Sequence, residues 1–259
     1  MTSTHQENFG QNRQTVMPGT AGADQRMPEP TQTAHDAQPG KDFAFRAVID
    51  QIDNLPWEQI SEDEVLRVAM AYYYFSVQFR ENLEVACRLH PNDAKLKELY
   101  TGECNTDNLS PWENIAKEGE AMNHDEFMRR LLALQPITDA DALERAGSLY
   151  LSQTRAMDDL VKAKSIASYE DGGLERVFSA MLRAPSWNGA GQKAFRHFLE
   201  KHIEFDSDDE AGHGALSRHI PVDDSILPLW VAFEEILRCA VPAFARDGHQ
   251  PARQTELAP

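Results

Sequence analysis

The chain has 259 residues, 41% of them hydrophobic, and a formal net charge of −17. Its length and apolar content support one large folded domain, whereas the negative charge argues against nucleic acid and anionic membrane surfaces as partners. The three cysteines lie far apart and no run of 18 apolar residues occurs, which argues against a disulfide framework and a membrane span. A cytoplasmic protein fits these features best.

The two ends of the chain differ in composition from its middle. Residues 1–40 are rich in Thr, Gln, Gly and Pro and contain one Val but no Leu or Ile. Such a segment cannot bury enough apolar surface to offset its chain entropy. The sequence therefore predicts a disordered tail over 1–40, a folded domain over 41–247 and a flexible C-terminal tail over 248–259.

The middle of the chain has the apolar spacing of amphipathic helices. Ser61 and Glu64 form a capping-box pattern in front of the longest such segment. Alternating β-branched runs and Asn-Gly hairpin signals are missing. The sequence predicts an all-α protein with about seven to nine helices in one bundle, at about 43–52, 61–90, 92–107, 122–134, 139–166, 174–182, 192 onward and 225–246.

One predicted helix combines imidazole and carboxylate side chains with an apolar stripe, in the segment FRHFLEKHIEFDSDDEAGHGALSRH (195–219). His202 and Asp206 are four residues apart, so they share one face of a helix. Asp209 and His213 fall with them in a sector of about 60°. Imidazole and carboxylate groups in an apolar setting are ligands for iron, manganese or zinc, although a solvated pair has the same spacing.

The position of His213 requires a break in this helix. In an unbroken helix it would lie about 16 Å along the axis from His202, too far for one metal cluster. Either the helix is interrupted between residues 207 and 212, which brings His213 back, or Asp209 takes its place. The glycines on both sides of His213 favour the interruption.

Three more candidate ligands lie on the apolar faces of other predicted helices. Glu103, His124 and Glu170 are each three or four positions from an apolar residue of the same stripe. A helix-end charge, a core histidine and a surface acid are the structural alternatives. We expect no lysine or arginine on these faces, and buried unpaired carboxylates are costly. Two divalent cations would balance the charge.

In their order and spacing, five segments resemble the haem-oxygenase-like non-haem di-iron oxidases and oxygenases, and the resemblance spans about residues 60–245. The segments are YYYFSVQFRENL (72–83), ELYTGECNTDN (98–108), NHDEFMRRLL (123–132), YEDGGLERVF (169–178) and HIEFD…GHG (202–214). The resemblance implies a haem-oxygenase-like bundle of about seven core helices without haem. It also implies two Fe(II) ions, with dioxygen as co-substrate.

Carried over position by position, the resemblance implies six iron ligands, with Glu170 as the bridging-type carboxylate. The segment between Glu103 and His124 is longer than in the family. The last histidine usually follows the aspartate by three or four positions, whereas His213 follows Asp206 by seven. Asp209 is therefore the alternative last ligand. The six are Glu103, His124, Glu170, His202, Asp206 and His213.

The resemblance further implies N-oxygenation or oxidative C–C cleavage of a small amino-acid-like or carboxylate substrate in natural-product biosynthesis. Tyr73, Phe75 and Phe79 are candidate walls of the substrate pocket, with plain core packing as the alternative. A homodimer and an electron-donor partner are compatible with the sequence.

Two other interpretations stay open. One is a metal-free enzyme of the same fold, either a cofactorless oxidase or a thiaminase-type enzyme with Cys104 as nucleophile. The other is a non-catalytic acidic scaffold.

Overall fold

The fold is seen in a computed structural model, which describes residues 43–103, 109, 111–170, 172–206 and 213–245. Within these ranges every regular element is a helix, and the one β-type contact is an isolated bridge between Trp112 and Ala116. The all-α class predicted from the sequence is therefore confirmed. The tails predicted over 1–40 and 248–259 lie outside the described residues and stay predictions.

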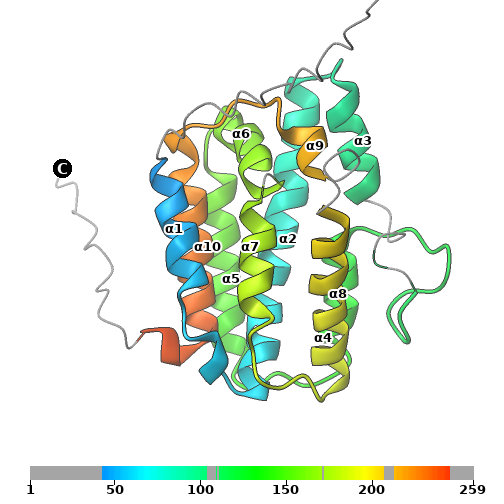
Figure 1. The fold of residues 1–259 in the computed structure, drawn as a ribbon, viewed down its shortest axis with the longest axis vertical. Coiled ribbons are helices and arrows are strands. Elements are labelled where there is room, and N and C mark those ends of the chain that lie inside the picture. The colour runs from blue at the N-terminus through cyan, green and yellow to red at the C-terminus, as the bar shows by residue number, and fades with distance from the viewer. Residues whose placement is uncertain (1–42, 104–108, 110, 171, 207–212, 246–259) are drawn as a thin grey trace, which may run out of the picture. The chain divides into compact units, whose positions relative to one another are not determined.

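The helices form a bundle in which segments distant in the sequence lie side by side (Figure 1). Three short 3₁₀ helices, η1 (Trp57–Gln59), η3 (Asp224–Ile226) and η4 (Pro242–Ala245), accompany the α-helices of the described residues. The α-helices are α1 (Ala44–Asp53), α2 (Glu62–Leu89), α3 (Ala94–Glu103), α4 (His124–Leu132), α5 (Ala140–Arg155), α6 (Asp159–Glu170), α7 (Gly173–Met181), α8 (Ala190–Asp206), α9 (His213–Ser217) and α10 (Leu227–Ala240).

The 28-residue helix α2 is the element around which the others are arranged (Figure 1). The predicted capping box closes its N-terminus. The Ser61 backbone N–H donates to Glu64 Oε2 at 2.8 Å, and the Glu64 N–H donates to Ser61 Oγ at 3.3 Å. Helices α3, α4, α5, α6, α8 and α10 all pack against α2. It therefore provides the common surface on which the site-bearing helices are placed.

An aromatic core joins α2, α6 and α10. The ring of Phe75 on α2 lies 4.2 Å from that of Phe233 on α10 and 5.0 Å from that of Tyr169 on α6, measured between ring centroids. Trp230 contacts Tyr169 edge-on at 5.0 Å. Buried aromatic pairs of this kind contribute packing beyond their area. They fix the end of α6, where Glu170 follows Tyr169.

The prediction of one helix over 139–166 is wrong. Helix α5 ends at Arg155 and α6 begins at Asp159. The Asp158 side chain accepts a hydrogen bond from the Leu160 backbone N–H at 2.8 Å. A short acidic side chain at this position favours a helix start over a helix interior. As a result, α5 and α6 pack on α2 as separate elements.

The predicted helix over 225–246 ends early. Helix α10 stops at Ala240, and Val241 is extended, with φ −122° and ψ 99°, because a following proline disfavours helical backbone in the residue before it. Helix α6 ends at Glu170 and α7 begins at Gly173. Gly172 has φ +81° there, a conformation that glycine adopts without steric cost.

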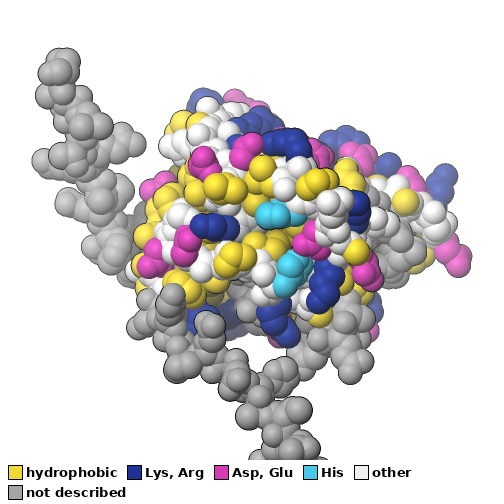
Figure 2. Space-filling model, turned by 90° about the horizontal axis from the view of Figure 1, so that it is seen from above, with side chains coloured by type: hydrophobic (Ala, Val, Ile, Leu, Met, Phe, Trp, Pro, Cys, Tyr) yellow, Lys and Arg dark blue, Asp and Glu magenta, His cyan; other side chains and the backbone are white. Residues whose placement is uncertain are grey.

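The end of the bundle near α9 carries histidine side chains at its surface, beside acidic, basic and hydrophobic ones (Figure 2). His90 and His219 are exposed, and the His219 ring is ion-paired with Asp93. Within the described part of the chain, no helix combines the length and the apolar character that crossing a membrane requires.

Candidate metal centre

Five of the six predicted ligands meet in the interior of the bundle. They come from five helices: the last residue of α3, the first of α4, the last of α6, the C-terminal half of α8 and the first of α9. Each is at most 7% exposed. The five are Glu103, His124, Glu170, His202 and His213.

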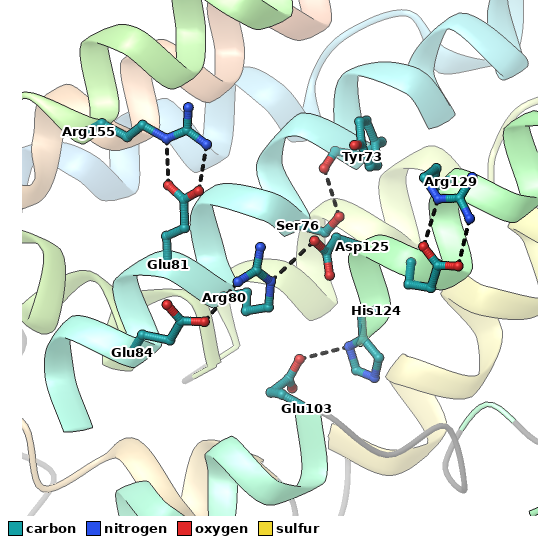
Figure 3. Close-up of polar contacts among 11 residues, drawn as sticks. Tyr73, Ser76, Arg80, Glu81, Glu84, Glu103, His124, Asp125, Arg129 and Arg155 are labelled. Atoms are coloured by element: carbon teal, nitrogen blue, oxygen red, sulfur yellow. Dashed lines mark hydrogen bonds and ion pairs between the residues drawn. The ribbon is translucent and has the colours of Figure 1, made fainter. Parts of the chain in front are cut away.

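The Glu103 carboxylate lies between two histidines. Its Oε2 is 2.8 Å from His124 Nδ1, and its Oε1 is 3.1 Å from His213 Nδ1. Figure 3 shows the Glu103 and His124 side chains pointing toward each other from α3 and α4. On the other side, His213 Nδ1 lies 3.4 Å from Glu170 Oε2. One ligand atom from each of Glu103, Glu170 and His213 therefore falls within a mutual distance of 4.8 Å.

A second contact of the cluster joins two imidazoles. His202 Nε2 lies 3.2 Å from His124 Nδ1. The other nitrogen of His202, Nδ1, donates to the Phe198 carbonyl oxygen at 2.8 Å, so Nε2 carries the lone pair. One proton on His124 Nδ1 can serve Glu103 Oε2 or His202 Nε2, but not both. In addition, His124 Nε2 is buried and has no hydrogen-bond partner among the described residues.

The approach of α9 to α6 depends on Gly214. A Cβ atom there would lie 3.0 Å from the backbone oxygen of Glu170, closer than nearly all real Cβ contacts. The glycine next to His213 thus lets the first turn of α9 lie against the end of α6. Residues 207–212, where the sequence predicts an interruption of the helix, lie outside the described residues, so the interruption stays a prediction.

Burial and neighbouring charges set the protonation of the cluster. Burial by itself raises the pKa of Glu103, but the charges of His124 and His213 outweigh it and hold that pKa at about 2. Burial raises the pKa of Glu170, and the hydrogen bond from His213 offsets only part of this effect. Burial and the His124 charge lower the pKa of His202 well below its usual value. His202 is therefore neutral, the form in which imidazole binds a metal.

A cavity of about 20 Å³ lies against the cluster, with room for about one water-sized group. Glu103, His124, Glu170 and His202 form one side of it. The remaining wall has polar and apolar members, which come mainly from α2. They are Tyr72, Ser76, Phe79, Arg80, Asn123 and Leu174.

A cation lines the cavity from a helix that carries none of the predicted ligands, and it is Arg80. This side chain lines the cavity from α2. Its Nε lies 3.2 Å from Asp125 Oδ2 and its Nη1 2.8 Å from Glu84 Oε1 (Figure 3). Because two other acids pair with its charge, Arg80 does not neutralise the cluster carboxylates. Sequence spacing could not reveal its reach, which depends on the packing of α2 against α4.

The predicted pocket residues differ in position. Phe79 lines the cavity. Phe75 packs into the aromatic core against Phe233, and Tyr73 packs edge-on against Tyr74, with 5.2 Å between the ring centroids. Neither residue is among the described residues that line the cavity. The signal that would have found the cavity wall is the stripe at positions 72, 76, 79 and 80, which repeats at helical spacing.

The remaining predicted residues cannot be placed at the centre. The Asp206 side chain lies outside what the structure describes, although its backbone ends α8. Asp209 and Cys104 also lie outside the described residues, so the choice of last ligand and the metal-free alternative stay predictions. Another histidine of α8, His197, contacts the Leu109 backbone oxygen and stacks on Trp112.

The donor set fits a divalent metal. It consists of carboxylate oxygens and imidazole nitrogens that face one another, and ions such as iron, manganese and zinc take such ligands. His202 has the further support that metal-binding histidines usually show, a hydrogen bond from the other ring nitrogen to a backbone carbonyl. No protein-family model matches this chain, and no curated protein or solved structure matches it.

Proposed function

We propose that the protein is a dioxygen-activating, non-haem di-iron oxygenase or oxidase of the haem-oxygenase-like type. The observation that carries the proposal is the buried meeting of Glu103, His124, Glu170, His202 and His213, whose ligand atoms face one another. The order of the motifs along the chain supports the same function. Mixed histidine and carboxylate ligation is typical of iron centres that react with dioxygen.

The arrangement divides into two groups that share Glu103. Its Oε2 faces His124, which in turn contacts His202. Its Oε1 faces His213, which also contacts Glu170. We therefore infer that His124 and His202 would help to hold one ion and Glu170 and His213 the other, with the Glu103 carboxylate available to both groups. Asp206, at the end of α8, is the further candidate ligand. The bound irons would supply the activation of dioxygen.

The protein's own side chains contribute orientation and exclusion of water. The Phe198 carbonyl holds the His202 ring with its Nε2 toward the cluster. The rings of Phe198 and Phe178 pack on His202, and the ring of Phe205 packs on His213. An apolar surround of this kind keeps bulk water from a reactive centre. The substrate class we propose is a small amino-acid-like or carboxylate compound, oxidised at nitrogen or at a C–C bond.

Anaerobic titration with Fe(II), followed by admission of air, tests the function. We expect uptake of about two irons per chain and a transient visible absorption band in air. Variants His202→Ala and His213→Ala should each lower the iron content, because each removes a ligand from a different group. A matched control, His219→Ala, removes an exposed imidazole and should change neither. A folded protein that takes up no iron would contradict the proposal.

A further inference from the structure

A second cavity, of about 200 Å³, lies between α2, α5 and α6, and we call it the α5–α6 cavity. Gln78, Asn82 and Val85 line it from one stripe of α2. Thr154 lines it from the end of α5, and Lys162 from the first turn of α6. Among the described residues that line it, none is a predicted metal ligand. Its volume is many times the about 10–15 Å³ that one water needs, so a small organic molecule fits.

The floor of the α5–α6 cavity holds a hydrogen-bond donor without an acceptor. Gln78 is 1% exposed. Its Oε1 accepts a hydrogen bond from the Tyr150 hydroxyl at 2.6 Å, which fixes the orientation of the amide. Its Nε2 is buried and has no hydrogen-bond partner among the described residues. Because an unpaired buried donor destabilises a fold, this nitrogen favours an occupant that offers an acceptor.

Two acceptors lie on the same floor. Asn82 uses its Nδ2 to donate to Ser165 Oγ at 3.0 Å, which leaves its Oδ1 as an acceptor. Thr154 Oγ1 donates to the Tyr150 backbone oxygen at 3.0 Å and keeps its lone pairs. Asn82 and Thr154 are 2% and 1% exposed. The floor therefore matches a group that accepts one hydrogen bond and donates two.

The charges on the wall of the α5–α6 cavity are already paired. Arg155 donates two hydrogen bonds to the Glu81 carboxylate, at 2.6 and 2.8 Å (Figure 3). Glu84, Arg88 and Lys162 are also ion-paired. An ion that enters the cavity has to take its partner from an existing pair, whereas a neutral molecule leaves every pair intact. The wall therefore favours an uncharged occupant.

We propose that the α5–α6 cavity is a binding site for a small uncharged molecule with a carboxamide or urea-type group, independent of the metal centre. The carbonyl oxygen accepts from Gln78 Nε2, and the N–H groups donate to Asn82 Oδ1 and Thr154 Oγ1. A carboxylate has no donor for these two acceptors, and an ammonium group has no acceptor for Gln78. A hydroxyl has one donor, so it satisfies one of the two acceptors.

An NMR titration of the full-length, isotope-labelled protein tests the site with propionamide, propionate and propylammonium, which are similar in size. We expect propionamide to bind with a dissociation constant on the order of 1 mM and to shift the side-chain amide signals of Gln78. Its binding should be at least about tenfold tighter than that of either charged probe.

Two substitutions of the same kind locate the contact. Gln78→Met keeps the length of the side chain but removes the donor, so it should weaken propionamide binding by at least about fivefold. Gln192→Met makes the same change at a glutamine of α8 that is also 1% exposed and is not among the described residues that line the cavity. It should bind propionamide as wild type does.

Four results would overturn the proposal. They are a wild-type protein that binds no propionamide at about 100 mM, a charged probe that binds as tightly as propionamide, wild-type affinity in Gln78→Met, and an equal loss in Gln192→Met. If Gln78→Met fails to fold, Thr154→Val decides. It removes one acceptor at nearly constant shape and should weaken binding by at least about threefold, and unchanged affinity would contradict the site.

Discussion

Glu234 on α10 and Glu170 on α6 are both buried glutamates, 8% and 7% exposed, but their partners differ in kind. Glu234 Oε1 accepts two hydrogen bonds from Arg238, one turn further along the same helix, at 2.7 and 2.9 Å. Glu170 meets His213 from another helix, and Glu103 lies beside it in the same cluster. The acid with a structural role receives a permanent cation from its own helix. The described partners of the cluster acids are imidazoles, which can lose their charge near neutral pH, whereas a guanidinium keeps its charge.

The largest expected effect is on metal binding. Glu103→Ala should weaken metal affinity by at least about 100-fold, because Glu103 faces both groups of the cluster and even residues that only hydrogen-bond to metal ligands have effects of up to about this size. A competition titration with a chelator of known affinity measures the change. Glu234→Ala is the matched control and should leave the affinity as in wild type. Equal affinities in the two variants would remove the distinction between the two glutamates.

The second largest effect is expected from removing Arg238, the cation that pairs with Glu234 on the same helix. Arg238→Ala should lower the free energy of unfolding by about 2 kcal/mol, because it leaves the Glu234 carboxylate buried without its partner. Urea denaturation measures the loss. Arg129→Ala removes an exposed partner of Glu126 and should cost less than about 0.5 kcal/mol. A negligible effect of Arg238→Ala would mean that α10 does not depend on its own cation.

Glu170→Gln should stabilise the metal-free protein at pH 7 by about 1 kcal/mol, because it replaces a carboxylate whose ionised form is costly to bury with a neutral amide. Burial raises the folded-state pKa of Glu170. Its contribution to stability is therefore fully present below the unfolded pKa of 4.5 and is lost as the pH rises through the folded pKa. The advantage of the variant should grow over that window in chelator-treated samples. Glu234→Gln should destabilise instead, and the same sign in both variants would contradict the comparison.

The smallest effect is the acid response of Glu103. Its folded-state pKa of about 2 lies below the usual 4.5, so its contribution is present above pH 4.5 and is lost as the pH falls toward 2. The difference in unfolding free energy between metal-free wild type and Glu103→Gln should shrink by about 1 kcal/mol between pH 4.5 and 3.5. A constant difference over this range would show that the imidazoles do not hold the Glu103 carboxylate ionised.

Local patterns predicted the helices and their type well. The capping box of Ser61 and Glu64 is a signal within a few residues, and it is confirmed. The break at Asp158 was missed because the Ala- and Leu-rich pattern on both sides is continuous. The end of α10 at Ala240 was missed although Pro242 marks it, because the apolar stripe continues to Phe244.

For the candidate site as well, local signals identified residues, whereas contacts between helices could not be predicted. Residue type and apolar neighbours sufficed to name Glu103, His124 and Glu170, because each lies on the buried stripe of its own helix. The facing atoms, the shared position of Glu103 and the contact of His202 with His124 depend on how five helices pack. Arg80 and Asn123 entered the cavity wall for the same reason, as no spacing within one helix relates α2 to the start of α4.

Helix α2 supplies much of the cavity wall but none of the described cluster residues. Tyr72, Ser76, Phe79 and Arg80 lie on one stripe of it, whereas Glu103, His124, Glu170, His202 and His213 belong to other helices. The cluster residues and most of the cavity wall thus come from separate stretches of the chain. Substitutions confined to α2 would change the size and polarity of the cavity while every described residue of the cluster stays in place.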